Sequence, residues 1–275
     1  MADGSGPVPG PPVSLPNINS MRHSAEVFIS LSLMSLCMVS GAQTQPSYVC
    51  LKTPSPIKVD GNLSENAWQL AQPLSPLQDI RGGDIPSPTK ATVLKMLWDD
   101  EFLYIGAYLE EDDIIANITG RDEIIWKEND FEVFLDPDGD GVGYFEFEFS
   151  AKGEILDLIM SKPYSEGGNF YSHWDGPGLQ IKTSVDGTLN RHSDKDKGWT
   201  LEVAIPRKAV MWGFDAPSAY PTWRMNFSRV EYLNGPGKPE ENWVWSPTGK
   251  VDIHIPSRWG WVHFVDVNVG EAIVK

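Results

Sequence analysis

Residues 126–149 carry the side chains best suited to chemistry, beginning with an aspartate loop. Asp136, Asp138 and Asp140 alternate in DPDGDG, as in the first half of an EF-hand calcium loop, where alternate carboxylates converge on one cation and a glycine permits the sharp turn. Phe147 occupies the twelfth position, where a coordinating acid is expected, so the match is partial. The loop is predicted to hold a structural Ca²⁺, and an acidic β-turn without metal is the alternative.

Two tryptophans are candidates for stacking against a sugar. Sugar binding requires a flat aromatic face against the C–H side of a pyranose ring and polar groups at its hydroxyl edge. Trp126 and Trp245 can supply the aromatic faces, because each lies in a polar loop. Arg224 and Asn226 share one face of a predicted strand and could extend the polar edge, with a salt-bridged surface as the alternative.

The elements that must position these side chains are mainly β-strands. On both sides of the aspartate loop, apolar residues alternate with others, as in two half-buried antiparallel strands with one face in the core and the other available. The same alternation predicts further strands at 89–98, 102–109, 155–160, 179–185, 199–205 and 223–230.

Short helices and long loops complete the predicted domain. Helical turns are expected at 65–70, burying Trp68, and at 207–212 after Pro206. Long loops, where binding residues usually lie, are expected at 112–127, 162–178 and 236–239. The chain is therefore predicted to form one all-β domain, a two-sheet antiparallel β-sandwich with short helical turns.

Seven sequence blocks identify a family resemblance. They are residues 57–68 (IKVDGNLSENAW), 96–114 (MLWDDEFLYIGAYLEEDDI), 126–149, 198–206 (GWTLEVAIP), 223–231 (WRMNFSRVE), 242–247 (NWVWSP) and 254–264 (HIPSRWGWVHF). In this order and spacing they resemble family 9 carbohydrate-binding modules and their close relatives, which share a DOMON-like β-sandwich related to immunoglobulin and jelly-roll folds. The resemblance covers residues 52–266.

The resemblance implies roles for particular residues. Trp126 and Trp245 fall where the family places two tryptophans that sandwich a terminal sugar, and Glu132 falls at a hydrogen-bonding position. The family also carries structural calcium. Some of its modules present an arginine and an asparagine on the strand after the acidic loop, whereas this chain has Glu146 and Glu148. Their specificity for reducing ends is therefore not carried over.

Charge and the N-terminal residues bear on partners and location. A net charge of −16 opposes binding to nucleic acid and anionic lipid, but not to a neutral glycan. Residues 21–42 are predicted to be a secretory signal, with an apolar run at 27–39 that is too short to span a membrane and small residues before a cleavage site at Ala42. Residues 1–20 are interpreted as an upstream disordered extension, 43–51 as a lead segment and 267–275 as a tail.

Cysteine content supports the same compartment. Cleavage after Ala42 would leave only Cys50, so no internal disulfide can form. We therefore expect a periplasmic or extracellular bacterial protein, a monomer that binds a glycan or oligosaccharide without cleaving it. Its expected role is in polysaccharide recognition and breakdown or uptake, beside a partner glycoside hydrolase.

Two other functions remain open at the level of sequence. Glu132, Glu146 and Glu148 could supply the paired carboxylates of a glycoside hydrolase, which must stand at a defined separation across a cleft. A haem-binding, electron-transferring DOMON domain would need Met and His ligands, which Met96, Met160, Met225 and His254 provide on paper. The relative placement of Trp126 and Trp245 distinguishes sugar binding from these alternatives.

Overall fold

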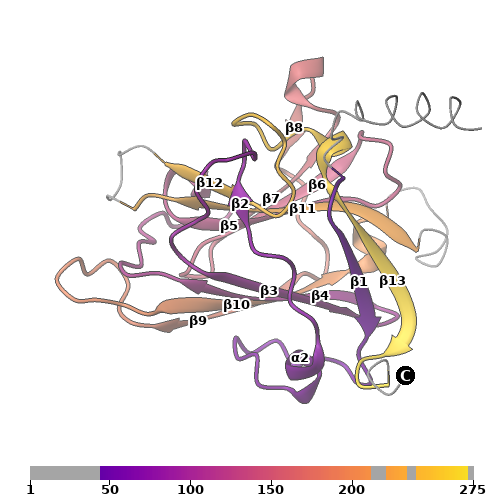
Figure 1. The fold of residues 1–275 in the computed structure, drawn as a ribbon, viewed down its shortest axis with the longest axis horizontal. Helices are drawn as coiled ribbons and strands as arrows, with labels where there is room; N and C mark the ends of the chain where they lie inside the picture. Colours follow the sequence, from indigo (N-terminus) through magenta and orange to yellow (C-terminus); the bar gives the residue numbers. More distant parts are fainter. Residues whose placement is uncertain (1–43, 212–220, 234–239, 272–275) are drawn as a thin grey trace, which may run out of the picture. The chain divides into compact units, whose positions relative to one another are not determined.

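Alternating apolar and polar residues build the strands of this protein, shown in Figure 1. The computed structural model describes residues 44–211, 221–233 and 240–271. The predicted signal at 21–42, the extension at 1–20 and the predicted loop at 236–239 lie outside the described residues. The strands are β1 (Ser47–Lys52), β2 (Gln78–Asp79), β3 (Thr92–Trp98), β4 (Phe102–Glu110), β5 (Asp130–Asp136), β6 (Tyr144–Phe149), β7 (Ile155–Met160), β8 (Phe170–Tyr171), β9 (Gln180–Asp186), β10 (Gly198–Pro206), β11 (Thr222–Glu231), β12 (Glu241–Val244) and β13 (Gly260–Asn268).

Helical elements are short in the described part of the chain. One α-helical turn, α2 (Asn66–Leu70), buries Trp68 as predicted. Four 3₁₀ turns lie in connections within the described residues, and the helix expected at 207–212 is represented there by one of them, at 207–209. They are η2 (Ile125–Lys127), η3 (Tyr164–Glu166), η4 (Arg207–Ala209) and η6 (Pro256–Arg258). None of the helices in the described ranges is long and apolar enough to cross a membrane.

The strands form two packed layers joined at one side, which confirms the predicted β-sandwich (Figure 1). The hydrogen-bonded order is β8-β7-β6-β5-β11-β13-β1-β3-β4-β10-β9, with β12 and β2 attached beside β11. One layer contains β5, β6, β7 and β11, and the other contains β3, β4, β10 and β9. In the described part of the chain, all strand pairs are antiparallel except those of β1, which runs parallel to both β13 and β3.

Strand β1 corrects the prediction that residues 43–51 are a lead segment. Tyr48 and Cys50 point into the main core, and Cys50 is fully buried. Ser47 to Leu51 pair with β13, and Leu51 pairs with Leu97 on β3, so this strand connects the two layers. The tail boundary also moves, because β13 continues to Asn268 and the next residue is buried.

The core lies between the layers and is built by the alternating residues that the sequence pattern indicates. Phe131, Val133 and Leu135 of β5 are buried there. A second cluster lies beneath α2, where the Trp68 indole donates to Glu202 Oε1 at 2.9 Å. A third cluster lies on the outer face of β5–β7 and includes Phe134. Loops therefore cover part of the face that was expected to be open, and every residue of β5 is buried.

Candidate functional site

A groove of about 460 Å³ lies on the outer face of the layer that contains β5, β6, β7 and β11. Its floor comes from strands and its walls come from loops. The floor residues are Glu132, Glu146, Glu148, Leu156, Leu158, Ser228 and Val230. The volume is within the range of small-ligand sites, which are usually about 300–1,000 Å³.

Strand register brings the polar floor residues together. Glu132 on β5 is paired with Glu148 on β6 and with Ser228 on β11, so the three side chains lie in one row across the sheet. The Ser228 hydroxyl hydrogen-bonds to Glu132. Glu146 lies two residues before Glu148 on β6, so it faces the same side of the sheet. At the wall, the backbone N–H of Trp126 donates to Glu148 Oε2 at 3.2 Å.

Burial changes the protonation of this floor. It raises the pKa of Glu132 to about 7 and, with the charge of Glu132 adding to burial, the pKa of Glu146 to about 8. Burial and the neighbouring Asp130 raise the pKa of Glu148 well above its usual range. A protonated carboxyl group can donate a hydrogen bond, whereas a carboxylate only accepts. The floor can therefore offer both donors and acceptors to a ligand hydroxyl.

Exposed aromatic side chains form part of the walls. Trp126, carried by η2, is 42 % exposed, as predicted for a residue that stacks on a ligand. Tyr164 on η3 and Phe170 on β8 also line the groove and are exposed. Both lie in the long loop that was expected at 162–178. Two separate loops thus supply flat apolar faces above a polar floor.

His254 occupies another wall of the groove. Its Nδ1 is 3.0 Å from the Tyr144 hydroxyl, its Nε2 is 4.0 Å from Glu146 Oε2, and its ring packs against Tyr164 with centroids 4.6 Å apart. Burial lowers the pKa of His254 to about 4, which outweighs the opposing charge of Asp252. His254 is therefore a neutral side chain at pH 7.

The prediction that Trp245 presents its face to a ligand is wrong. Trp245 is only 1 % exposed and packs in the main core, with its centroid 6.0 Å from that of Phe227. Its indole N–H donates to Ser75 Oγ at 3.0 Å. Gly260 makes room for the ring, because a Cβ at that position would lie 2.4 Å from Trp245 Cζ3. Trp126 and Trp245 therefore do not form a pair across the groove.

Arg224 and Asn226 share a strand face as predicted, but neither lines the groove. The segment after β12 folds over this part of β11. Arg224 lies 3.9 Å over the Trp261 ring and donates to the carbonyl of Ser257 at 3.2 Å. The amide of Asn226 is fully buried and bonds to both the N–H and the carbonyl of Ser246, each at 2.9 Å. Both residues satisfy backbone groups instead of forming the polar edge.

The aspartate loop places its three carboxylates together at the end of β5. Ligand atoms of Asp136, Asp138 and Asp140 lie within 4.8 Å of one another. Asp136 is buried, and its two oxygens accept the N–H groups of Gly139 at 3.1 Å and Gly141 at 3.0 Å. These hydrogen bonds close the turn, and they occupy some of the Asp136 lone pairs that a calcium ion would need. The donor set still suits Ca²⁺, which remains a prediction for this loop.

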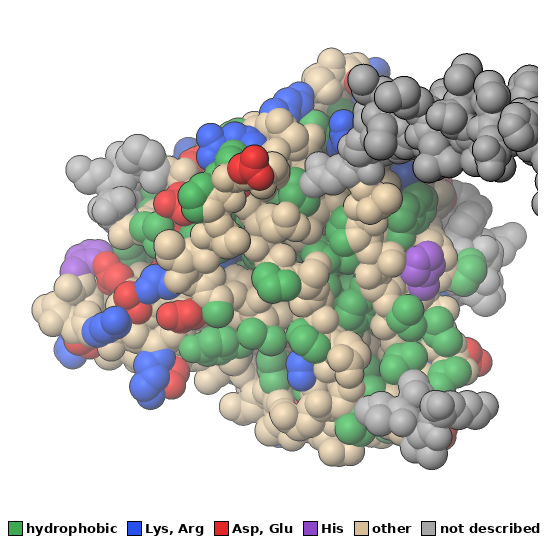
Figure 2. Space-filling view, viewed as in Figure 1, with side chains coloured by type: hydrophobic (Ala, Val, Ile, Leu, Met, Phe, Trp, Pro, Cys, Tyr) green, Lys and Arg blue, Asp and Glu red, His purple; other side chains and the backbone are tan. Residues whose placement is uncertain are grey.

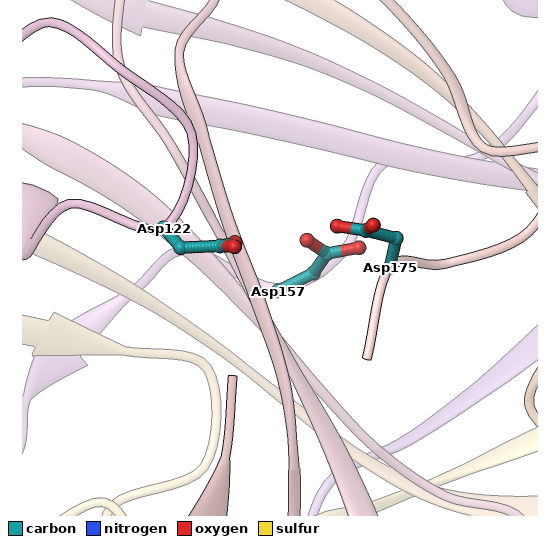
Figure 3. Close-up of side chains that lie close together, drawn as sticks. All are labelled: Asp122, Asp157 and Asp175. Atoms are coloured by element: carbon teal, nitrogen blue, oxygen red, sulfur yellow. The ribbon is translucent and has the colours of Figure 1, made fainter. Parts of the chain in front are cut away.

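A further aspartate cluster, drawn in Figure 3, is compensated by Arg121, which the figure does not draw. Asp122, Asp157 and Asp175 bring oxygens within 4.8 Å of one another. Arg121 bonds to Asp157 at 2.5 Å and to Asp175 at 2.6 Å, and Asp157 also accepts the N–H of Gly176 at 2.6 Å. The cluster therefore connects two loops through ion pairs, and the Arg121 guanidinium supplies its positive charge.

The haem alternative gains no support from these positions. Met96, Met160 and Met225 are fully buried in apolar clusters, and none of them lines the groove with His254. The aromatic walls from residues 162–178 were not selected from the sequence, and His254 was named there only as a possible haem ligand. The length and tyrosine content of that loop were the available signal, whereas nothing in the sequence around His254 indicated its contact with the groove.

Comparison with known proteins gives one family and several similar folds. The model of the carbohydrate family 9 binding domain-like family matches residues 59–266. No curated protein matches the chain. A candidate carbohydrate-binding protein from Bacteroides uniformis ATCC 8492 is 18 % identical with a TM-score of 0.61, over 81 % of this chain and 100 % of the other.

A family 9 carbohydrate-binding module from Caldicellulosiruptor kristjanssonii, solved with cellotriose, is 14 % identical with a TM-score of 0.54, over 83 % of this chain and 98 % of the module. The same source provides a module structure with glucose, at 14 % identity and a TM-score of 0.53, over 80 % of this chain and 96 % of the other. At these identities the likeness concerns the fold.

Proposed function

This chain belongs to the carbohydrate family 9 binding domain-like family, and we propose that it binds carbohydrate without cleaving it, in the groove above β5, β6 and β11. The observation that carries the proposal is the combination of exposed aromatic faces with a floor of buried carboxyl groups. A pyranose has an apolar C–H face, which matches the aromatic walls, and a polar hydroxyl edge, which matches the carboxyl groups of the floor. Trp126 stacks on the ring, while Glu132 and Glu148 select its hydroxyls.

The relatives suggest which glycans to test first. Modules of similar fold from Caldicellulosiruptor kristjanssonii were solved with cellotriose and with glucose. Neutral glucan oligosaccharides therefore head the panel. The net charge of −16 disfavours uronic-acid polymers by repulsion, which makes an anionic glycan a useful negative comparison.

We place this binding outside the cytoplasm. The predicted signal at residues 21–42 supports export, and a single cysteine in the remaining chain is compatible with an oxidising compartment without a disulfide. The protein would then act in polysaccharide breakdown or uptake, presenting a glycan to a partner glycoside hydrolase.

Titration calorimetry of Trp126→Ala against the glycan panel tests the site. Buried aromatic anchors at binding sites cost about 2 kcal/mol when truncated, so affinity should fall roughly thirtyfold. Tyr171→Ala is the matched control, because Tyr171 is an exposed aromatic residue beside Phe170 that does not line the groove. Equal affinities for the wild type and Trp126→Ala would remove the groove from consideration.

The same incubations decide the hydrolase alternative. Three groove-floor carboxyl groups with perturbed pKa values resemble the residues that glycosidases use. A binding protein leaves an oligosaccharide intact, whereas a hydrolase releases reducing ends. Reducing sugar that accumulates with the wild type and not with Glu146→Gln would replace the binding proposal with catalysis.

A further inference from the structure

Three buried carboxyl groups converge at the floor of the groove and directly beside it. Glu132 on β5 and Glu148 on β6 line the groove, and Asp130 on β5 lies next to them without being a lining residue. Each is at least nine-tenths buried, and one oxygen from each lies within 4.8 Å of the others. Glu132 and Glu148 are direct partners in the strand register, where like charges repel each other. Such a row of acids needs a compensating positive charge or protons.

No basic side chain in the described part of the chain supplies that charge. Neither lysine nor arginine lines the groove among the described residues. Among the described residues, the one ion-pair contact of a floor carboxyl group joins Glu146 to His254, at 4.0 Å. The cluster in Figure 3 is the contrasting case, because there Arg121 bonds directly to two of the three aspartates.

Unpartnered oxygens on buried acids point to a ligand. Asp130 is 1 % exposed, and its Oδ2 has no hydrogen-bond partner among the described residues. Glu146 lies outside the cluster of three but lines the same groove, is 5 % exposed and has an unpartnered Oε2. Leaving a buried charged acceptor unsatisfied costs several kcal/mol in general. Two such oxygens beside three converging carboxyl groups are better explained by a bound species than by chance.

We propose that the groove floor binds a divalent cation through Asp130, Glu132 and Glu148. All the ligand atoms are carboxylate oxygens, which favours a hard cation such as Ca²⁺ over a metal that prefers nitrogen or sulfur. Calcium takes six to eight oxygen ligands, so coordination positions remain open toward the groove for water or ligand oxygens. The inference goes beyond carbohydrate binding, because the metal alone is the probe and no sugar is needed to test it.

The experiment must separate this site from the aspartate loop. Calcium titration calorimetry is performed on chelator-treated full-length protein that carries Asp138→Asn and Asp140→Asn, which disables the loop. Glu132→Gln and Glu148→Gln are then added one at a time. Using two variants keeps the test valid if one of them does not fold. The matched control is Glu202→Gln, a buried glutamate on β10 that accepts hydrogen bonds from Trp68 and Gly61 and lies outside the groove.

We expect one calcium site in the loop-disabled protein. Its affinity should fall by more than about tenfold in Glu132→Gln and in Glu148→Gln, because each removes a ligand charge, and should be unchanged in Glu202→Gln. The backbone N–H of Trp126 donates to Glu148, and Trp126 lines the groove, so Tb³⁺ bound there should also show emission sensitised by the Trp126 indole. Absence of calcium binding in the loop-disabled protein, or binding that survives both glutamine variants, would overturn the proposal.

Discussion

At the scale of single residues, burial decides what each candidate side chain can do. Trp126 and Trp245 were both predicted to lie in polar loops, yet one ring is 42 % exposed and the other 1 %. The Trp245 ring fills the space left by Gly260 and packs on Phe227, so it contributes to the core. The Glu132 carboxyl group is also buried but faces the groove, where burial changes its pKa instead of removing it from use.

Truncating Trp245 should lower the free energy of unfolding. Any loss of ligand affinity would follow from that destabilisation, because the Trp245 ring does not line the groove. Trp→Ala in a packed core typically costs about 3–5 kcal/mol of unfolding free energy. Urea denaturation of Trp245→Ala beside Trp126→Ala measures the difference, and Trp126→Ala should lie within about 1 kcal/mol of the wild type. A Trp245→Ala protein with an unchanged midpoint would contradict the buried position of the ring.

His254 should make stability depend on pH in a defined direction. Its folded-state pKa of about 4 lies below the ordinary value of 6.5, so the unfolded chain takes up a proton first as pH falls. The stabilisation is complete above pH 6.5 and is lost as pH falls toward 4, by at most about 1.4 kcal/mol per pH unit. Tyr144, Tyr164, Glu146 and Asp252 are the titratable groups around the ring.

The measurement is a difference between variants. Unfolding free energies of the wild type and His254→Asn are compared at pH 7 and pH 4.5, and the gap between them should shrink at the lower pH. His192→Asn is the control, because Asp113 raises the pKa of exposed His192 and gives a dependence of opposite sign. A gap that stays constant with pH would mean that His254 titrates normally in the folded state.

At the scale of elements, hairpin register and loop closure create the sites. The β5–β6 hairpin pairs Glu132 with Glu148, and its turn holds the aspartate loop. Asp136 belongs to the strand and is rigidly placed by two backbone N–H donors, while Asp138 and Asp140 extend from the turn. One hairpin therefore presents carboxylates at two separate places, the groove floor and the loop.

Calcium in the aspartate loop should raise thermal stability. A ligand that binds only the folded state adds about 2.7 kcal/mol at a hundredfold excess over its dissociation constant. The melting temperature of Glu132→Gln, in which the groove site is weakened, should be higher in calcium than in chelator. Adding Asp138→Asn should abolish that increase. If calcium and chelator give the same melting temperature in Glu132→Gln, the loop is an acidic turn without metal.

At the scale of the whole molecule, the chain is acidic, and its surface carries both signs of charge. The net charge is −16, and on the face in Figure 2 lysine and arginine side chains are interspersed with acidic ones. That face offers no continuous basic patch in the described part of the chain, as a nucleic-acid partner would need. The strand β1 matters at this scale, because it pairs with both layers.

Export should remove the residues before Gln43. The apolar run at 27–39 and the small residues before Ala42 predict cleavage there. N-terminal sequencing of protein isolated from its native host should begin at Gln43. Protein that stays in the cytoplasm with Met21 retained would contradict the predicted signal.

The sequence by itself determined most of the fold. Alternation in 131–135 and 145–149 predicted which side chains enter the core, because successive residues of a strand point to opposite faces. Trp68 and the exposure of Trp126 followed from equally local patterns. The ordered blocks also indicated the family before any tertiary information. These features depend on neighbours in the chain, so they can be recognised from it.

Only the tertiary structure decided which side chains meet. The segment 43–51 is polar enough to suggest a lead, yet Tyr48 and Cys50 complete the core once β13 and β3 lie on either side. The Trp245 ring fits into the core because Gly260, fifteen positions later, has no side chain to block it. His254 contacts Glu146 from a loop more than a hundred residues later in the chain. Strand register and loop folding over long sequence separations set these contacts, and no local pattern encodes them.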